Sequence, residues 1–195
     1  MQYINEKITA QLLKYSIINE KDVPIYHYGL ELILTTVFST FSILLLACFL
    51  DNLLLGLTYL LFSIPLRITA GGYHASTYPK CLFISSNIYI ILSFTAKLFH
   101  LCKISPFLWN SMLLLCTVYI LLKAPVKNKH HQINEQKIKK NKLLVKLFLL
   151  IDCLCLIPLL YIYPNNYIVQ FSILTITSVA ALIIPTQRKK VRYNV

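Results

Sequence analysis

The chain has 195 residues, of which 57% are hydrophobic and only 13% are charged. This composition is too apolar for a soluble domain and is typical of an integral membrane protein, with residues 1–195 forming a single domain. The formal net charge of +12 comes from 19 Lys and Arg residues against 7 Asp and Glu residues. Because the basic residues crowd between hydrophobic segments, we expect no nucleic-acid partner and favour anionic lipid headgroups or an acidic substrate.

The N-terminal segment, residues 1–18, carries charged residues and has no long apolar core, so it does not have the pattern of a cleavable signal. Ile4, Ile8, Leu12 and Tyr15 recur at helical spacing. The pattern predicts an amphipathic helix, which either lies flat on a membrane surface or stands as a short solvated helix.

Six segments are apolar enough for membrane spans, because a spanning helix needs about 20 mostly apolar residues. They are Leu30–Leu50, Leu53–Leu66, Leu82–Leu101, Ile104–Leu122, Leu143–Tyr163 and Tyr167–Ile184. The second segment is short, and either Arg67 lengthens it by snorkelling or the segment is re-entrant. Tight polar links between neighbouring segments indicate antiparallel hairpins. The sequence therefore predicts an all-α, polytopic membrane bundle of about six helices.

The distribution of Lys and Arg predicts the orientation, since cytoplasmic loops are enriched in these residues. With the N-terminus inside, every Lys and Arg falls on an inner segment except Lys97 and Lys103. We therefore expect both termini, the stretch 67–81 and a basic loop at about 123–142 on the cytoplasmic side. The loop is interpreted either as a topology anchor that touches lipid headgroups or as a dock for acidic substrate residues.

The stretch from Arg67 to Cys81 is the one long polar interruption in the first half of the chain. It contains two of the four glycines, together with a proline, an arginine, a histidine and a cysteine. A cysteine needs a base or a neighbouring positive charge to act as a nucleophile, and His74 is the nearest base to Cys81. On one straight helix, seven residues would separate the two side chains by about 10 Å of rise, which is too far for contact.

The same stretch also supplies a break in the backbone. Pro79 disfavours helix at the residue before it, and Gly71 and Gly72 allow a sharp turn just before His74. We expect Cys81 at the start of the third spanning helix, where the helix dipole favours a thiolate, with the histidine folded back on it. The pattern thus indicates a thiol–imidazole site at the face of the bundle.

Three charged residues are candidates for supporting this site. Arg67 cannot act as a base; it is either a clamp on a substrate carboxylate, a stabiliser of an oxyanion, or an ordinary flanking arginine. Glu31 and Asp152 are acids at or within spans, where a charge usually has a partner, and either could orient the imidazole or pair with Arg67. Alternatively, Glu31 lies at headgroup level and Asp152 pairs with a lysine or a backbone group. The other cysteines are interpreted as packing residues, with no disulfide framework and no metal site: Cys48, Cys102, Cys116, Cys153 and Cys155.

The pattern Arg67-x-x-x-Gly71-Gly72-Tyr73-His74-Ala75, followed by Cys81, resembles the signature of the accessory gene regulator protein B (AgrB-like) family. These are membrane cysteine endopeptidases of Gram-positive bacteria. Two further stretches are similar to the family's patterns: Tyr28-Gly29-Leu30-Glu31, and Lys123-Ala124-Pro125 with Asn128-Lys129. His130-His131 stands where the family often has a proline. The resemblance covers nearly the whole chain.

The resemblance implies that His74 and Cys81 are the catalytic pair. Supporting or substrate-binding roles fall on Arg67, Gly71, Gly72, Glu31 and Ser76. The enzyme would remove the acidic C-terminal tail of an AgrD-like pro-peptide, hold the peptide as a thioester on the cysteine, and promote its cyclisation to a thiolactone quorum-sensing pheromone. It would use no cofactor and no metal, and would act as a homodimer in the cell membrane with its active site on the cytoplasmic side.

Two alternatives belong to other functional classes. A small transporter or export component would use Asp152 and Glu31 along a pathway, with Cys81 merely structural. A scaffold would anchor a membrane complex through the basic loop. Sensitivity of the activity to substitution of Cys81 separates the enzyme from both.

Overall fold

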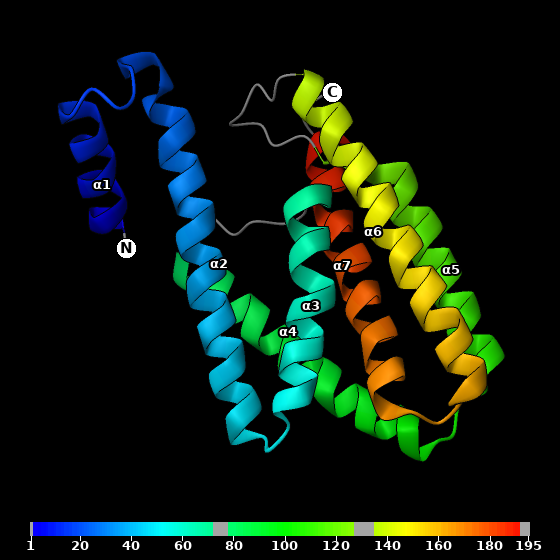
Figure 1. The fold of residues 1–195 in the computed structure, drawn as a ribbon. Helices are drawn as coiled ribbons and strands as arrows, with labels where there is room; N and C mark the ends of the chain where they lie inside the picture. The colour runs from blue at the N-terminus through cyan, green and yellow to red at the C-terminus, as the bar shows by residue number, and fades with distance from the viewer. Residues whose placement is uncertain (1, 72–77, 127–134, 192–195) are drawn as a thin grey trace.

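The computed structural model describes residues 2–71, 78–126 and 135–191, which form seven α-helices and one short 3-10 helix without a strand (Figure 1). In chain order these are α1 Gln2–Lys14, η1 Glu20–Asp22, α2 Val23–Phe49, α3 Leu53–Ala70, α4 Tyr78–Leu101, α5 Pro106–Lys123, α6 Glu135–Ile162 and α7 Tyr167–Val191. Six of the described helices, α2 to α7, are long and apolar enough to cross a membrane. The predicted all-α polytopic bundle is therefore confirmed.

The second candidate span, which the sequence predicts as the short segment Leu53–Leu66, forms a helix long enough to cross a membrane. Helix α3 has 18 residues and continues past Leu66 to Ala70. At about 1.5 Å per residue it is about 27 Å long, close to the ~30 Å of a hydrocarbon core. Figure 1 shows α3 running beside α2 and α7 from one end of the bundle toward the other. Of the two alternatives for this segment, the structure supports lengthening, because the helix continues through Arg67 to Ala70.

Asparagine side chains begin the helices at two of the tight links. The Asn52 side-chain oxygen accepts a hydrogen bond from the Leu55 N–H at 3.3 Å. The Asn166 oxygen accepts from the Ile168 and Val169 N–H groups at 2.9 and 3.3 Å. These bonds satisfy N–H groups that have no partner inside the helix. Short capped links of this kind keep consecutive helices antiparallel.

Helix α7 lies at the centre of the bundle and packs against α3, α4, α5 and α6 (Figure 1). Helix α4 crosses obliquely behind α2 and α3 in the view of Figure 1 and packs against both α2 and α7. On α4, the buried Tyr89 ring meets Tyr59 of α3 at 5.5 Å and Phe171 of α7 at 6.3 Å between centroids. Helix α2 stands at the edge, packed against α1, α3 and α4.

Helix α1 packs beside α2 (Figure 1) and is attached to it by its polar side. Asn5 and Thr9 are buried, and the Asn5 amide donates a hydrogen bond to the His27 carbonyl at 3.0 Å. The apolar stripe is more open, because Ile4 is 44% exposed and Tyr15, just after the helix, is 71% exposed. The predicted N-terminal helix thus has a buried polar side, and apolar side chains face outward.

The hairpin of α2 and α3 brings the two helix backbones very close at one point. A Cβ added to Gly56 would lie 2.5 Å from the Ala47 Cβ, closer than two such atoms normally approach. From this contact the two helices diverge toward the start of α2 and the end of α3, above α4 (Figure 1). The three helices therefore form a wedge that is narrow near Gly56 and wide at the opposite end.

We expect Gly56→Val to lower the unfolding temperature of the detergent-solubilised protein, because the new side chain must push α2 and α3 apart. Overpacking of this kind costs about 1–3 kcal/mol. Gly29→Val on α2 is the matched control, since an added Cβ there meets nothing within 4 Å. Equal unfolding temperatures for wild type and Gly56→Val would contradict the close helix contact.

Candidate functional site

Helix α3 ends in a turn that requires glycine. Gly71 has φ 74° and ψ −156°, a combination open almost only to glycine. Its N–H donates to the Arg67 carbonyl at 3.2 Å. A Cβ at this position would also lie 3.4 Å from the Val126 carbonyl oxygen. Helix α3 therefore ends here, where the sequence predicted a break.

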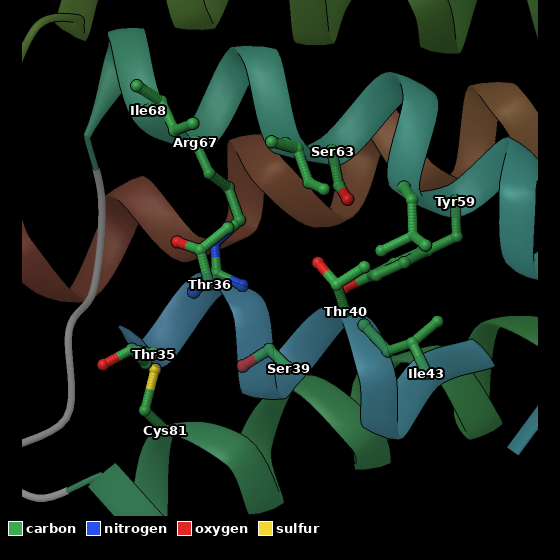
Figure 2. A pocket seen from close by; sticks show the side chains of 12 residues that line it. Thr35, Thr36, Ser39, Thr40, Ile43, Tyr59, Ser63, Arg67, Ile68 and Cys81 are labelled. Atoms are coloured by element: carbon green, nitrogen blue, oxygen red, sulfur yellow. The ribbon is translucent and has the colours of Figure 1, made fainter. Parts of the chain in front are cut away.

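Cys81 lies in the first turn of α4, which begins at Tyr78 with Pro79 as its second residue. Proline is tolerated in a first turn because the N–H groups there have no intrahelical partner. Cys81 is only 6% exposed. Its sulfur points into the space between α2 and α3 (Figure 2). The predicted position at the start of the third spanning helix is confirmed, and the thiol faces an internal pocket.

This pocket occupies the wedge between α2, α3 and α4 and has a volume of about 50 Å³ (Figure 2). That volume holds a few water molecules or a small chemical group. Helix α2 lines it with hydroxyl groups, from Thr35, Thr36, Ser39 and Thr40. On α3, the lining changes along the helix from Tyr59 through Ser63 to Arg67. Polar groups thus gather inside an otherwise apolar bundle, and one end of their pocket holds Cys81.

Arg67 reaches into the same pocket from α3, toward α2 and α4 (Figure 2). Its Nη1 donates a hydrogen bond to the Ser85 Oγ at 3.1 Å. Ser85 is 1% exposed and lies one helical turn after Cys81, on the same face of α4. Helix α4 therefore carries both the thiol and the hydroxyl that holds the guanidinium. Sequence reasoning missed Ser85, although its spacing of four residues from Cys81 was a signal for it.

The two acids singled out in the sequence are not partners of this arginine. Neither Glu31 nor Asp152 forms an ion pair with Arg67 in the described part of the chain. Glu31 lies on α2, one turn before Thr35, whose hydroxyl donates to the Glu31 carbonyl at 2.7 Å. Asp152 is half-buried on α6, a helix that contributes nothing to the pocket. The guanidinium thus enters the pocket without a carboxylate partner from either residue.

The start of the basic loop is attached to the end of α3. The Val126 N–H, three residues past the end of α5, donates to the Ala70 carbonyl at 2.9 Å. This bond places the beginning of the predicted loop at 123–142 against the residue that precedes the Gly71 turn. The end of α3 and the residues that follow α5 therefore lie together at one end of the bundle.

Three predicted site residues lie outside the described residues: Gly72, His74 and Ser76. All six cysteines are free. Cys116 and Cys153 contact Thr177 and Thr117 between helices, but Cys48, Cys102 and Cys155 are exposed rather than packed in the core. Within the described ranges, no three His, Cys, Asp or Glu residues are grouped to hold a metal ion.

Comparison with known proteins supplies the family. The family model described as accessory gene regulator B matches residues 5–184, nearly the whole chain. Comparison with curated proteins and with solved structures returned no match. The matched range contains all six candidate spans, the pocket and Cys81. The chain therefore belongs to the accessory gene regulator B family of multi-pass membrane proteins, and this membership supports a part in the processing of a quorum-sensing peptide.

Proposed function

We propose that the protein is a membrane cysteine endopeptidase that cuts the tail from an AgrD-like pro-peptide and promotes closure of the remaining peptide to a thiolactone. One observation carries this proposal: the Cys81 thiol, in the first turn of α4, faces a polar pocket that also contains the Arg67 guanidinium. Cys81 is the nucleophile, and His74, in the seven-residue link between α3 and α4, is its base.

The first step transfers the peptide to the enzyme. The thiol of Cys81 gives its proton to the imidazole of His74, and the thiolate attacks the carbonyl carbon of the scissile bond. As the C–S bond forms, the C–N bond breaks, and the imidazolium returns the proton to the nitrogen of the leaving tail. The product is an acyl thioester on Cys81 and a free tail.

Arg67 supports this step with its positive charge. A tetrahedral intermediate places negative charge on the former carbonyl oxygen, and a fixed cation stabilises that charge most strongly where water is excluded. The bond to Ser85 restricts the guanidinium to the pocket, so little reorganisation is needed when the oxyanion forms.

The second step closes the ring. A cysteine thiol inside the peptide loses its proton to the imidazole and attacks the thioester, and the Cys81 thiolate leaves and regains a proton. One thioester replaces another, so no external energy source is required. Holding the peptide thiol beside the acyl group gives a high effective concentration. A buried pocket with few water molecules limits competing hydrolysis.

The basic loop supplies a surface for the acidic tail of the substrate. Its first residues are bonded to the end of α3, the helix that contributes Arg67 to the pocket. The excess of Lys and Arg at the loops around the site supports a cytoplasmic active site with both termini inside, and contact with anionic headgroups. The resemblance to the family supports a homodimer as the active form.

We expect Cys81→Ala and His74→Ala each to abolish tail removal, by at least about a hundredfold, while membrane levels stay normal. The substrate is a tagged pro-peptide with an amphipathic N-terminal segment, a central cysteine and an acidic tail, co-expressed with the full chain and followed by mass spectrometry. Cys48→Ala is the matched control, because Cys48 lies on α2, outside the pocket. Persistent cleavage in Cys81→Ala would exclude the protease assignment.

The positive charge of Arg67 should also affect the rate at which Cys81 reacts with charged thiol reagents when no substrate is present. In a variant whose single cysteine is Cys81, we expect an anionic sulfonatoethyl methanethiosulfonate to react several-fold faster than a cationic trimethylammonium analogue. Arg67→Gln should remove this preference. Lys80→Gln is the control, since Lys80 is exposed next to Cys81 but does not line the pocket. An unchanged preference in Arg67→Gln would show that another cation acts on the thiol.

A further inference from the structure

Two contacts fix how α3 and α4 are positioned along α2. The first is the close approach of Ala47 on α2 to Gly56 on α3, which run antiparallel. Arg67 comes eleven residues after this glycine, so it is about level with Thr36, which comes eleven residues before the alanine. The guanidinium therefore enters the pocket at the height of the first two helical turns of its α2 lining.

The second contact relates α4 to α2, and these two helices run in the same general direction (Figure 1). The hydroxyl oxygens of Ser42 on α2 and Ser86 on α4 are 3.1 Å apart and share a hydrogen bond. Cys81 comes five residues before Ser86, so it is about level with Val37 on α2. The thiol and the guanidinium of Arg67 thus reach the pocket at nearly the same height, from two different helices.

Ser39 brings a hydroxyl group to this level from the third helix. It follows Thr36 by three residues, which places both on one face of α2, and both line the pocket. Figure 2 shows the Ser39 oxygen pointing toward the end of the pocket that holds the Cys81 sulfur and the Arg67 guanidinium. A thiol, a cation and a neutral hydroxyl therefore border one space, each from its own helix.

The Ser39 hydroxyl has no hydrogen-bond partner among the residues that the structure describes. Neighbouring hydroxyls on α2 are used differently: that of Thr35 donates to the Glu31 carbonyl at 2.7 Å, and that of Ser42 is bonded to α4. Donation to the carbonyl four residues earlier is the usual way to satisfy a helical hydroxyl. The Ser39 O–H is therefore available to donate to a group that enters the pocket.

We infer that Ser39 is a further catalytic residue, which donates a hydrogen bond to the oxyanion that forms when Cys81 attacks the scissile carbonyl. The inference rests on the proposed function. In the tetrahedral intermediate the carbonyl carbon is bonded to the sulfur, so the oxyanion lies beside the sulfur in the pocket. Arg67 supplies positive charge from α3, and Ser39 supplies a neutral donor from α2. Because the negative charge exists only between substrate and thioester, this hydrogen bond is strongest at the step that limits cleavage.

The first test separates catalysis from binding. Ser39→Ala removes the donor, Ser39→Thr retains a hydroxyl, and Ser42→Ala is the matched control, because Ser42 is bonded to Ser86 and does not line the pocket. Each full-length variant is reconstituted in vesicles, and removal of the tail from the tagged pro-peptide is timed over a range of peptide concentrations.

We expect Ser39→Ala to lower kcat and kcat/KM together by at least about tenfold, with KM within about threefold of wild type. Ser39→Thr should recover most of the lost rate, and Ser42→Ala should cleave like wild type. A wild-type kcat in Ser39→Ala, or a loss confined to KM, would overturn the inference, because the hydroxyl would then act on substrate binding or not at all.

The second test isolates the oxyanion from the thiol. A peptide aldehyde, made from the residues that precede the cleaved bond, adds to Cys81: the C–S bond forms, no group leaves, and the former carbonyl oxygen takes the place of the oxyanion. Iodoacetamide alkylates the same thiol with loss of iodide and forms no oxyanion. In the variant whose single cysteine is Cys81, Ser39→Ala should weaken binding of the aldehyde at least about tenfold and leave the iodoacetamide rate within about twofold.

Equal effects on both reagents would overturn the role of Ser39, since a general distortion of the site would explain them. Cleavage that survives Cys81→Ala would instead overturn the proposed function itself.

Discussion

The close contact of Ala47 with Gly56 is the constraint on which the site depends. It fixes α2 and α3 together next to their connecting turn, where a larger residue in place of glycine would separate them. Because the helices diverge from this point, the space between them widens toward the end of α3. From α4, Cys81 lines this space, and Ser85 and Tyr89 follow it at four-residue intervals on the same buried face. Every described residue that lines the pocket belongs to one of these three helices, so their packing shapes it.

Polar groups inside this bundle are expensive, because the surrounding membrane offers them no water. The protein nevertheless places a guanidinium, a thiol and a row of hydroxyl groups in one pocket. The Ser85 hydroxyl accepts a hydrogen bond from the guanidinium, and the Thr35 hydroxyl donates one to the backbone carbonyl of Glu31. The groups left without partners face the same space as the thiol.

Much of the fold could be predicted from the sequence, because the length and hydropathy of a membrane span are local properties. All six spans were predicted, and the break at Gly71 and the position of Cys81 in a first turn followed from the restricted backbones of glycine and proline. The sequence left open whether the second segment is lengthened through Arg67 or is re-entrant. The structure supports the first alternative, because the arginine remains helical while its charge finds a partner on α4.

The partners across helices could not be predicted in the same way. Ser85 and the α2 hydroxyls look like ordinary helix residues in the sequence, and only the packing of α2 and α3 on α4 brings them to Arg67 and Cys81. The acids suggested as partners for the arginine do not form that ion pair in the described ranges, since a pairing inferred from charge alone takes no account of which helix faces are in contact.

The hydrogen bond from Val126 to Ala70 joins two segments that are far apart in the sequence. One end of the bond is Val126, where the chain enters the basic loop predicted at 123–142. The other end is Ala70, which immediately precedes Gly71. The bond fixes the backbone just after α5 against the last residue of α3, so a shift of either helix end displaces the other. Two connections that are remote in the sequence therefore start from one common point of the bundle.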